Sequence, residues 1–230
     1  MEPLLLHFYL DVMSPYTYLA WKVLGRYRSV WDLQVVLRPC FLGAIMQGSG
    51  NQPPAMVPNR AAFMHADILR TVRWIGIEDV FKHMPSNFFQ SLPKLSLKVN
   101  RLLAATSEPR AQWALTDAAF TAIWELPKYR ENESNDFLYD EAEFFESLFA
   151  AAGLPFPGPD GLEALVAKGR DLVKAHTQEA LRLGAFGAPV FHYPGSVDEK
   201  IFFGSDRWEQ MAFVFRKPWS GPTNLGRCKL

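Results

Sequence analysis

Cysteine is scarce in this sequence, whose 230 residues include only Cys40 and Cys228. A disulfide-rich secreted scaffold needs more cysteines, and two thiols so far apart in sequence form neither a CxxC pair nor a metal-ligand cluster. The scarcity therefore predicts a reduced, intracellular protein.

The sequence also has no formal net charge and no long apolar run. The 24 Lys and Arg residues balance 24 Asp and Glu residues, so the sequence lacks the electrostatic footprint of a protein that binds nucleic acid or an anionic membrane. No apolar run approaches the roughly 18 residues of a membrane-spanning helix, and Met1-Glu2-Pro3 lacks the basic start of a signal peptide. We expect no nucleic-acid partner and no membrane span.

The start of the chain has an α/β pattern. Residues 4–12 form a short apolar run that is typical of a strand buried on both faces. Ser14-Pro15 follows, and a serine N-cap with proline at the first helical position predicts a helix to about Arg28. Residues 33–38 then predict a second strand, and a strand–helix–strand connection of this length suits parallel pairing.

The middle of the chain is predicted to be helical. Glycine, asparagine, glutamine and proline over 43–58 favour a loop, after which apolar residues recur at helical spacing. Asp160 and Glu163 have the spacing of a capping box, and Gly184 has the position of a helix-ending glycine. The predicted helices cover 62–75, 95–105, 111–126, 142–152 and 162–183.

The last segment returns to strands. Residues 189–193 and 200–204 flank a Pro-Gly-Ser turn and predict a hairpin. A final helix is expected to begin at Ser205 or at Asp206, which has capping-box spacing with Glu209.

This order of elements predicts an α/β, thioredoxin-like fold with a large all-helical insertion. Residues 1–60 and 185–230 would form the thioredoxin-like domain. Residues 61–184 would form the helical insertion domain.

The turn between the first strand and the first helix is the first candidate site, because open α/β sheets place chemistry beyond the carboxyl ends of their strands. A dithiol oxidoreductase would need cysteine where Ser14 and Thr17 stand. Ser14 is either a plain N-cap or a hydroxyl donor to an anion such as a thiolate. Lowering a thiol pKa from about 8.5 to about 6.5 takes roughly 2.7 kcal/mol, which a charge-assisted hydrogen bond and a helix terminus together can supply.

Two further motifs carry polar groups suited to a ligand. Pro189 follows a Gly-rich turn and precedes a strand, which makes it a candidate cis-proline with free backbone before it. In Phe203–Arg207, Ser205 and a helix N-terminus can bind a carboxylate while Asp206 pairs with an ammonium group. The two motifs together suit an amino-acid zwitterion, although simple capping explains the second equally well.

The motifs together resemble those of the kappa-class glutathione transferases, in the DsbA-related thioredoxin-like superfamily, from the first strand to the last helix. The resemblance rests on Phe8-Tyr9-Leu10-Asp11-Val12-Met13-Ser14-Pro15-Tyr16, Leu37-Arg38-Pro39, Ser49-Gly50-Asn51-Gln52-Pro53-Pro54, Gly184-Ala185-Phe186-Gly187-Ala188-Pro189 and Phe203-Gly204-Ser205-Asp206-Arg207. It implies a homodimer that transfers reduced glutathione, its co-substrate, to small hydrophobic electrophiles, and it leaves peroxidase activity open.

The resemblance also implies roles for particular residues. Ser14 would be catalytic, since it would hold and activate the glutathione sulfur, and Asn51 would contact the glycyl end. The backbone of Ala188 would pair with the cysteinyl unit, while Ser205 and Asp206 would hold the γ-glutamyl end. The implied glutathione-binding residues are Ser14, Pro15, Tyr16, Asn51, Ala188, Pro189, Ser205 and Asp206.

The electrophile would meet a wall from the helical insertion. Phe63, Met64, Trp74 and Phe88 are candidates, although each is more simply explained as a core residue. Cys40 is expected to be a buried thiol and not a nucleophile. The histidines have no metal-ligand spacing, so we expect no metal.

The tail resembles a targeting signal. Cys228-Lys229-Leu230 has the small-basic-leucine form of the peroxisomal address whose type is Ser-Lys-Leu. The resemblance implies a peroxisome or a mitochondrion, and no Arg-rich, acid-poor transit segment precedes the first strand. We expect a peroxisomal location, with the mitochondrion as the alternative.

Two other functions stay open at this stage. A glutathione-dependent isomerase of the 2-hydroxychromene-2-carboxylate type resembles this chain in fold and in the serine turn. A redox-silent thioredoxin-like binding module is the non-enzymatic alternative. The presence of Asn51, Ser205 and Asp206 alongside Ser14 argues against the module, which would not need all four.

Overall fold

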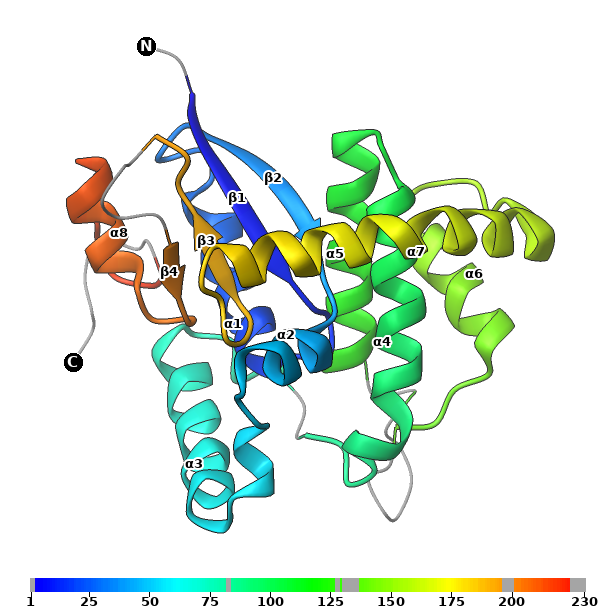
Figure 1. Cartoon of the computed structure of the whole chain (residues 1–230), viewed down its shortest axis with the longest axis horizontal. Helices are drawn as coiled ribbons and strands as arrows, with labels where there is room; N and C mark the ends of the chain where they lie inside the picture. The colour runs from blue at the N-terminus through cyan, green and yellow to red at the C-terminus, as the bar shows by residue number, and fades with distance from the viewer. Residues whose placement is uncertain (1–2, 82–83, 127–128, 130–136, 196–200, 224–230) are drawn as a thin grey trace.

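The computed structural model describes residues 3–81, 84–126, 129, 137–195 and 201–223 and is drawn in Figure 1. Its elements are β1 (Leu4–Leu10), α1 (Pro15–Tyr27), β2 (Leu33–Pro39), α2 (Leu42–Ser49), the 3₁₀ turn η1 (Pro54–Met56), α3 (Pro58–Trp74), α4 (Phe88–Ala105), α5 (Pro109–Trp124), α6 (Glu141–Ala151), α7 (Gly158–Arg182), β3 (Val190–His192), β4 (Ile201–Phe203) and α8 (Trp208–Phe215).

A four-stranded sheet in the order β2-β1-β3-β4 forms the centre of the molecule. β1 runs parallel to β2 and antiparallel to β3, and β3 forms the expected antiparallel hairpin with β4. Figure 1 shows α7 crossing in front of the sheet, with α4, α5 and α6 gathered at its side. The α/β, thioredoxin-like prediction with a helical insertion is confirmed.

The alternating side chains of β1 are buried on both faces of the sheet. Leu6, Phe8 and Leu10 belong to the large core with α1 and α8, where Phe8 stacks on Phe191 at a ring-centroid distance of 4.8 Å. Tyr9 belongs to a smaller core on the other face, with side chains from α2, α7 and β3. This burial on both faces explains the nearly unbroken apolar run in the sequence.

Helix α7 connects the helical insertion to the sheet. One part of it packs along α4, and its C-terminal part packs on β2 and α2. In that part Thr177 accepts a hydrogen bond from the Phe41 N–H (3.0 Å), and His176 Nδ1 donates to the Pro39 carbonyl (3.0 Å). The division of the chain into residues 1–60 plus 185–230 and 61–184 stays a prediction.

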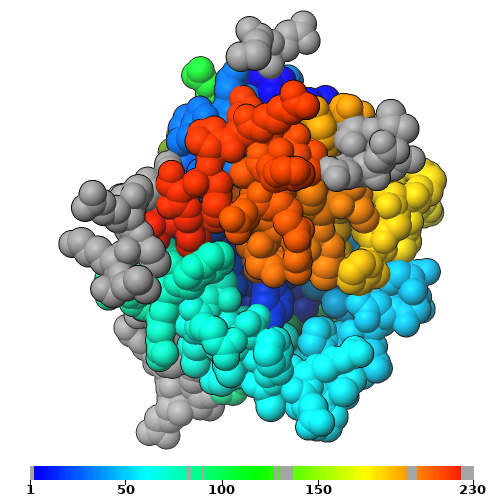
Figure 2. Space-filling view, turned by 90° about the vertical axis from the view of Figure 1, so that its left-hand side faces the viewer, coloured from blue at the N-terminus to red at the C-terminus, as the bar shows by residue number. Residues whose placement is uncertain are grey.

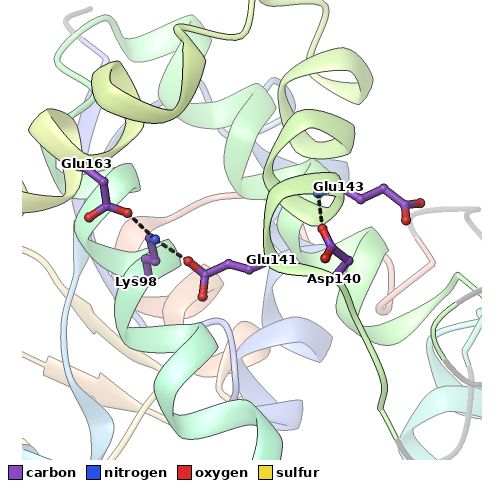
Figure 3. A network of polar contacts seen from close by, with 5 residues as sticks. All are labelled: Lys98, Asp140, Glu141, Glu143 and Glu163. Atoms are coloured by element: carbon purple, nitrogen blue, oxygen red, sulfur yellow. Dashed lines mark hydrogen bonds and ion pairs between the residues drawn. The ribbon is translucent and has the colours of Figure 1, made fainter.

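Lys98 connects three helices of the insertion at their surface. Figure 3 shows this α4 side chain between Glu141 of α6 and Glu163 of α7, with Asp140 capping α6 through the Glu143 N–H (2.9 Å). Both glutamates are exposed, so each ion pair contributes at most about 1 kcal/mol.

The predicted loop over 43–58 is wrong in part, because this segment contains α2 and η1. Ile45 of α2 is fully buried, and the first N–H group of the helix, that of Leu42, donates to Asp11 Oδ2 (2.9 Å). Gly50 ends the helix with a φ of 72°, a left-handed conformation that glycine adopts readily. Because Asp11, which caps this helix, is 31 residues away in sequence, the residues near position 42 carry no signal of the helix start.

Several predicted helix boundaries are also wrong. Helix α7 begins at Gly158, so Asp160 lies within its first turn and does not cap it, and α8 begins at Trp208, with Asp206 paired to Arg207 and not capping the helix. Helix α4 begins at Phe88, before Pro93, which stands inside it. The Ser14 N-cap and the left-handed glycine at position 184 are confirmed.

No helix among the described residues is both long and apolar enough to cross a membrane. The tripeptide Cys228-Lys229-Leu230, predicted from the sequence to be a targeting signal, lies outside the described residues.

Gly169 is expected to be essential for the packing of α7 on α4. A Cβ atom added there would lie 1.9 Å from the Arg101 carbonyl oxygen, so the two helix backbones would have to separate. We predict that Gly169→Ala lowers the free energy of unfolding by about 3 kcal/mol, the upper range for overpacking. Urea unfolding followed by circular dichroism measures this.

Gly25→Ala in α1 is the matched control, because a Cβ at Gly25 has no neighbour within 4 Å. Since alanine is the better helix former, this variant should gain about 0.5–1 kcal/mol. Equal unfolding midpoints for the two variants would show that the close approach at Gly169 has no energetic role.

Candidate functional site

Ser14 stands where the predicted turn places it, between β1 and α1. Its Oγ accepts the Thr17 N–H (3.2 Å), which caps α1, and donates to the Ala188 carbonyl (3.3 Å), 174 residues away. The Ser14 residue is 3 % exposed. The Ala188–Pro189 peptide bond is cis, as predicted, so the serine hydroxyl faces the backbone just before the cis-proline.

A pocket of about 490 Å³ opens at this point. In Figure 2 the blue N-terminal segment is visible at the bottom of a hollow between the orange C-terminal segment and the cyan region that includes α3. All eight residues that the sequence predicted as glutathione-binding line this pocket: Ser14, Pro15, Tyr16, Asn51, Ala188, Pro189, Ser205 and Asp206.

Asn51 follows α2 and connects its loop to the segment before the cis-proline. Its Nδ2 donates to the Phe186 carbonyl (2.7 Å), and its Oδ1 accepts the Gln52 N–H (2.9 Å). The Asn51 N–H itself donates to Met46 of α2 (2.8 Å). These bonds fix the side of the pocket formed by Asn51.

Ser205 and Asp206 come from the turn between β4 and α8. The Gly204 N–H donates to the Pro189 carbonyl (3.1 Å), and the Ser205 carbonyl accepts the Trp208 Nε1–H (2.8 Å). Ser205 is buried, whereas Asp206 is exposed and paired with Arg207 at 3.1 Å. The turn thus presents a hydroxyl and a carboxylate to the same pocket.

The opposite wall comes from the helical insertion. Met64 of α3 and Phe88 of α4, both candidates from the sequence, line the pocket, together with Met84 and Phe89, which the sequence analysis missed. Phe63 and Trp74 are not among the lining residues, and they are 62 % and 46 % exposed.

The pocket-facing side of α3 also carries a polar contact. Met64, Asp67 and Thr71, at helical spacing, line the pocket. The Tyr16 hydroxyl donates to Asp67 Oδ2 (3.1 Å), and Asp67 Oδ1 accepts from Arg70 (3.3 Å). Burial, and next the charge of Asp67, raise the pKa of Tyr16, so its hydroxyl stays protonated and acts as a donor.

Cys40 is a buried thiol, as expected. It is fully buried, its Sγ donates to the Leu10 carbonyl (3.2 Å), and burial raises its pKa well above the ordinary value. A thiolate is therefore disfavoured at this position. Among the described residues, no group of three or more His, Cys, Asp or Glu side chains could hold a metal ion.

Comparison with known proteins agrees with this geometry. Residues 5–215 match the family model of the DSBA-like thioredoxin domain. The chain is 31 % identical to Glutathione S-transferase kappa 1 of Homo sapiens, over 96 % of this chain and 94 % of that protein, and 31 % identical to the Rattus norvegicus protein over the same shares. The chain belongs to the kappa-class glutathione transferase family, within the DSBA-like thioredoxin proteins.

A solved structure of 2-hydroxychromene-2-carboxylate isomerase has the same fold as this kappa-class chain. It matches with a TM-score of 0.71 at 16 % identity, over 92 % of this chain and 94 % of that one. At this identity the likeness supports the thioredoxin-like fold alone.

The sequence analysis missed helix α2 and the hydrogen bonds that Asp11 makes to the pocket-lining residues Met13 and Leu42 of this kappa-class chain. Asp11 was part of an apolar run, in which a charged residue is itself a signal, since a buried carboxyl group is costly without partners. Its hydrogen bonds connect the serine turn to α2.

Proposed function

We propose that this enzyme is a glutathione transferase that ionises the thiol of reduced glutathione at Ser14 and directs the thiolate at small apolar electrophiles. One observation carries the proposal. Eight residues from four separate segments of the chain, each with a role implied by the family resemblance, line one pocket. Membership of the kappa-class family supports the same reading.

Glutathione would lie extended along the cis-proline, with the backbone of Ala188 pairing with the cysteinyl unit. Its glycyl end would reach Asn51, and its γ-glutamyl end would reach Ser205 and Asp206. The Ser14 hydroxyl and the Ala188 carbonyl now satisfy each other at 3.3 Å. On binding, the hydroxyl would turn to the sulfur and the carbonyl would accept the cysteinyl N–H, so neither buried group loses its partner.

Ser14 favours the thiolate over the thiol because it donates a charge-assisted hydrogen bond at the N-terminus of α1. Such a bond contributes about 1.5–3 kcal/mol, which matches the roughly 2.7 kcal/mol needed to lower a thiol pKa by two units. The thiol proton passes to solvent, the sulfur lone pair forms the bond to the electrophilic carbon, and the leaving group departs with its bonding electrons.

We further propose that the same thiolate reduces organic hydroperoxides. The sulfur lone pair attacks the terminal peroxide oxygen, the O–O bond breaks, and the alkoxide takes a proton to leave as an alcohol. The glutathione sulfenic acid formed reacts with a second glutathione to give the disulfide and water. The Met- and Phe-lined wall supports an apolar substrate.

Ser14→Ala tests the thiolate step. In the wild-type protein, the ultraviolet thiolate absorbance of bound glutathione should titrate well below pH 8. In the variant, the pKa of the bound thiol should rise by about one to two units, since the variant loses a hydrogen bond of 1.5–3 kcal/mol. Conjugation at pH 6.5 should fall about 5- to 50-fold and recover toward wild type near pH 9.5, where the thiol ionises unaided.

Ser147→Ala is the control, because Ser147 of α6 donates to the Phe144 carbonyl (2.8 Å) and does not line the pocket. It should keep the wild-type titration. If glutathione fails to bind the wild-type protein, or if the Ser14 and Ser147 variants have the same pH profile, the proposed function is wrong.

We also propose that the protein is a homodimer that pairs through α8. Phe213 is 84 % exposed there, and it lines a shallow hollow of about 460 Å³ with Phe202 and Val214. A large exposed aromatic side chain beside other apolar groups favours association. Asp206 lines both this hollow and the glutathione pocket, so the second subunit would lie beside the site.

Phe213→Asp should convert the dimer to a monomer at micromolar concentration in sedimentation velocity, because it would bury a carboxylate without a partner. Phe63→Asp is the matched control on α3, where Phe63 is 62 % exposed. A monomeric wild-type protein, or equal effects of both variants, would contradict an α8 interface.

We propose a peroxisomal location on the basis of Cys228-Lys229-Leu230, with the mitochondrion as the alternative. A fluorescent protein fused before residue 1 should colocalise with a peroxisomal marker in eukaryotic cells. Removal of the three residues should disperse it. Colocalisation with mitochondria in both forms would favour the alternative.

A further inference from the structure

Asp11 is a fully buried carboxyl group at the end of β1, and it holds the turn that carries Ser14. Its Oδ1 accepts the Met13 N–H (3.1 Å), and its main-chain carbonyl accepts the Ser14 N–H (3.0 Å). Asp11 therefore holds both Met13 and Ser14 by hydrogen bonds to their main-chain amides.

The second carboxyl oxygen reaches a different part of the chain. Asp11 Oδ2 accepts the N–H of Leu42 (2.9 Å), the first residue of α2. Gly50 and Asn51 follow the other end of this short helix. Met13 and Leu42, whose amides the carboxyl group binds, both line the pocket. One side chain thus fixes both the sulfur side and the glycyl side of the site.

Asn100 of α4 bridges the same two segments. Its Oδ1 accepts the Val12 N–H (3.3 Å), and its Nδ2 donates to the Cys40 carbonyl (3.1 Å). Asp11 and Asn100 are both fully buried. The junction between the serine turn and the start of α2 therefore consists of two adjacent polar side chains enclosed in the core.

A carboxyl group in this position is costly to the fold. No ion pair of the described residues involves Asp11. Burial raises its pKa, and the hydrogen bonds that the carboxyl group accepts from the Leu42 and Met13 amides oppose that rise. An apolar side chain at position 11 would fill the space at a lower desolvation cost. What an apolar side chain could not provide is the pair of hydrogen bonds from Asp11 to the two pocket-lining segments.

We infer that Asp11 is a positioning residue that couples the serine turn to α2, so that the sulfur and glycyl sites for glutathione form together. The inference rests on the proposed function. It predicts that loss of the carboxyl group weakens glutathione binding and also impairs thiol ionisation, although Asp11 touches neither group.

Asp11→Asn tests the inference, because it keeps the side chain's size but places an NH₂ group against one of the two amides. Glutathione affinity by calorimetry should fall about tenfold, the loss expected for one hydrogen bond to a charged group. The pKa of the bound thiol should rise toward its free value. In a double-mutant cycle with Asn51→Ala, the combined loss should be smaller than the product of the single losses, because the Asp11 variant already displaces Asn51.

Asp140→Ala is the matched control, since Asp140 also accepts a backbone N–H, at the N-cap of α6 (Figure 3), but does not line the pocket. It should lower thermal stability while leaving glutathione affinity and thiol pKa unchanged. If Asp11→Asn behaves in the same way, Asp11 is only structural and the inference is overturned.

Amide hydrogen exchange without ligand separates this inference from the proposed function. Hydrogen exchange should accelerate at both the Met13 and the Leu42 amide in Asp11→Asn. A folded Asp11→Ala variant should show faster exchange at the same two amides. Acceleration at only one of the two amides overturns the coupling. Failure of the wild-type protein to bind glutathione would overturn the proposed function instead, and exchange would still decide whether Asp11 couples the two segments.

Discussion

The pairing of β1 with strands from opposite ends of the chain is the constraint on which the site depends. β2 lies parallel on one side through the α1 connection, and β3 lies antiparallel on the other, with Tyr9 opposite Val190. Because the pairing with β3 is antiparallel, the carboxyl end of β1 meets the amino end of β3. Ser14 and the cis-proline therefore meet at one edge of the sheet, although 174 residues separate Ser14 from Ala188.

Helix α7 makes the large insertion compatible with that sheet. It leaves the insertion along α4, where Gly169 allows the backbones to approach closely, and then covers the sheet face that carries Tyr9. The chain re-enters the sheet at β3 directly after this helix ends. Helix α7 thus connects α4, which carries part of the wall that faces the serine turn, to the sheet.

The sheet, the serine cap, the cis-proline and most helices could be predicted from the sequence because their signals are local. Apolar periodicity, Ser14-Pro15 and a proline after a glycine-rich turn each act within a few residues. Helix α2 and the late start of α8 could not be predicted, since the first amide of α2 is capped by Asp11, 31 residues earlier in the chain, and Asp206 pairs with Arg207. The sequence predicts only part of the wall that would face the electrophile. Met64 lines the pocket, and helical spacing from it leads to Asp67 and Thr71, whereas Phe63 is exposed and does not line it.

Four methionine side chains line the pocket: Met13, Met46, Met64 and Met84. Thioether side chains are flexible and polarisable, so they can repack around molecules of different outline. A surface of this kind selects ligands by apolarity and by reach to the nucleophile, and only weakly by shape. The same thioethers are oxidisable to sulfoxides, which would make the wall polar, so an oxidising substrate held in this pocket can change the surface that holds it.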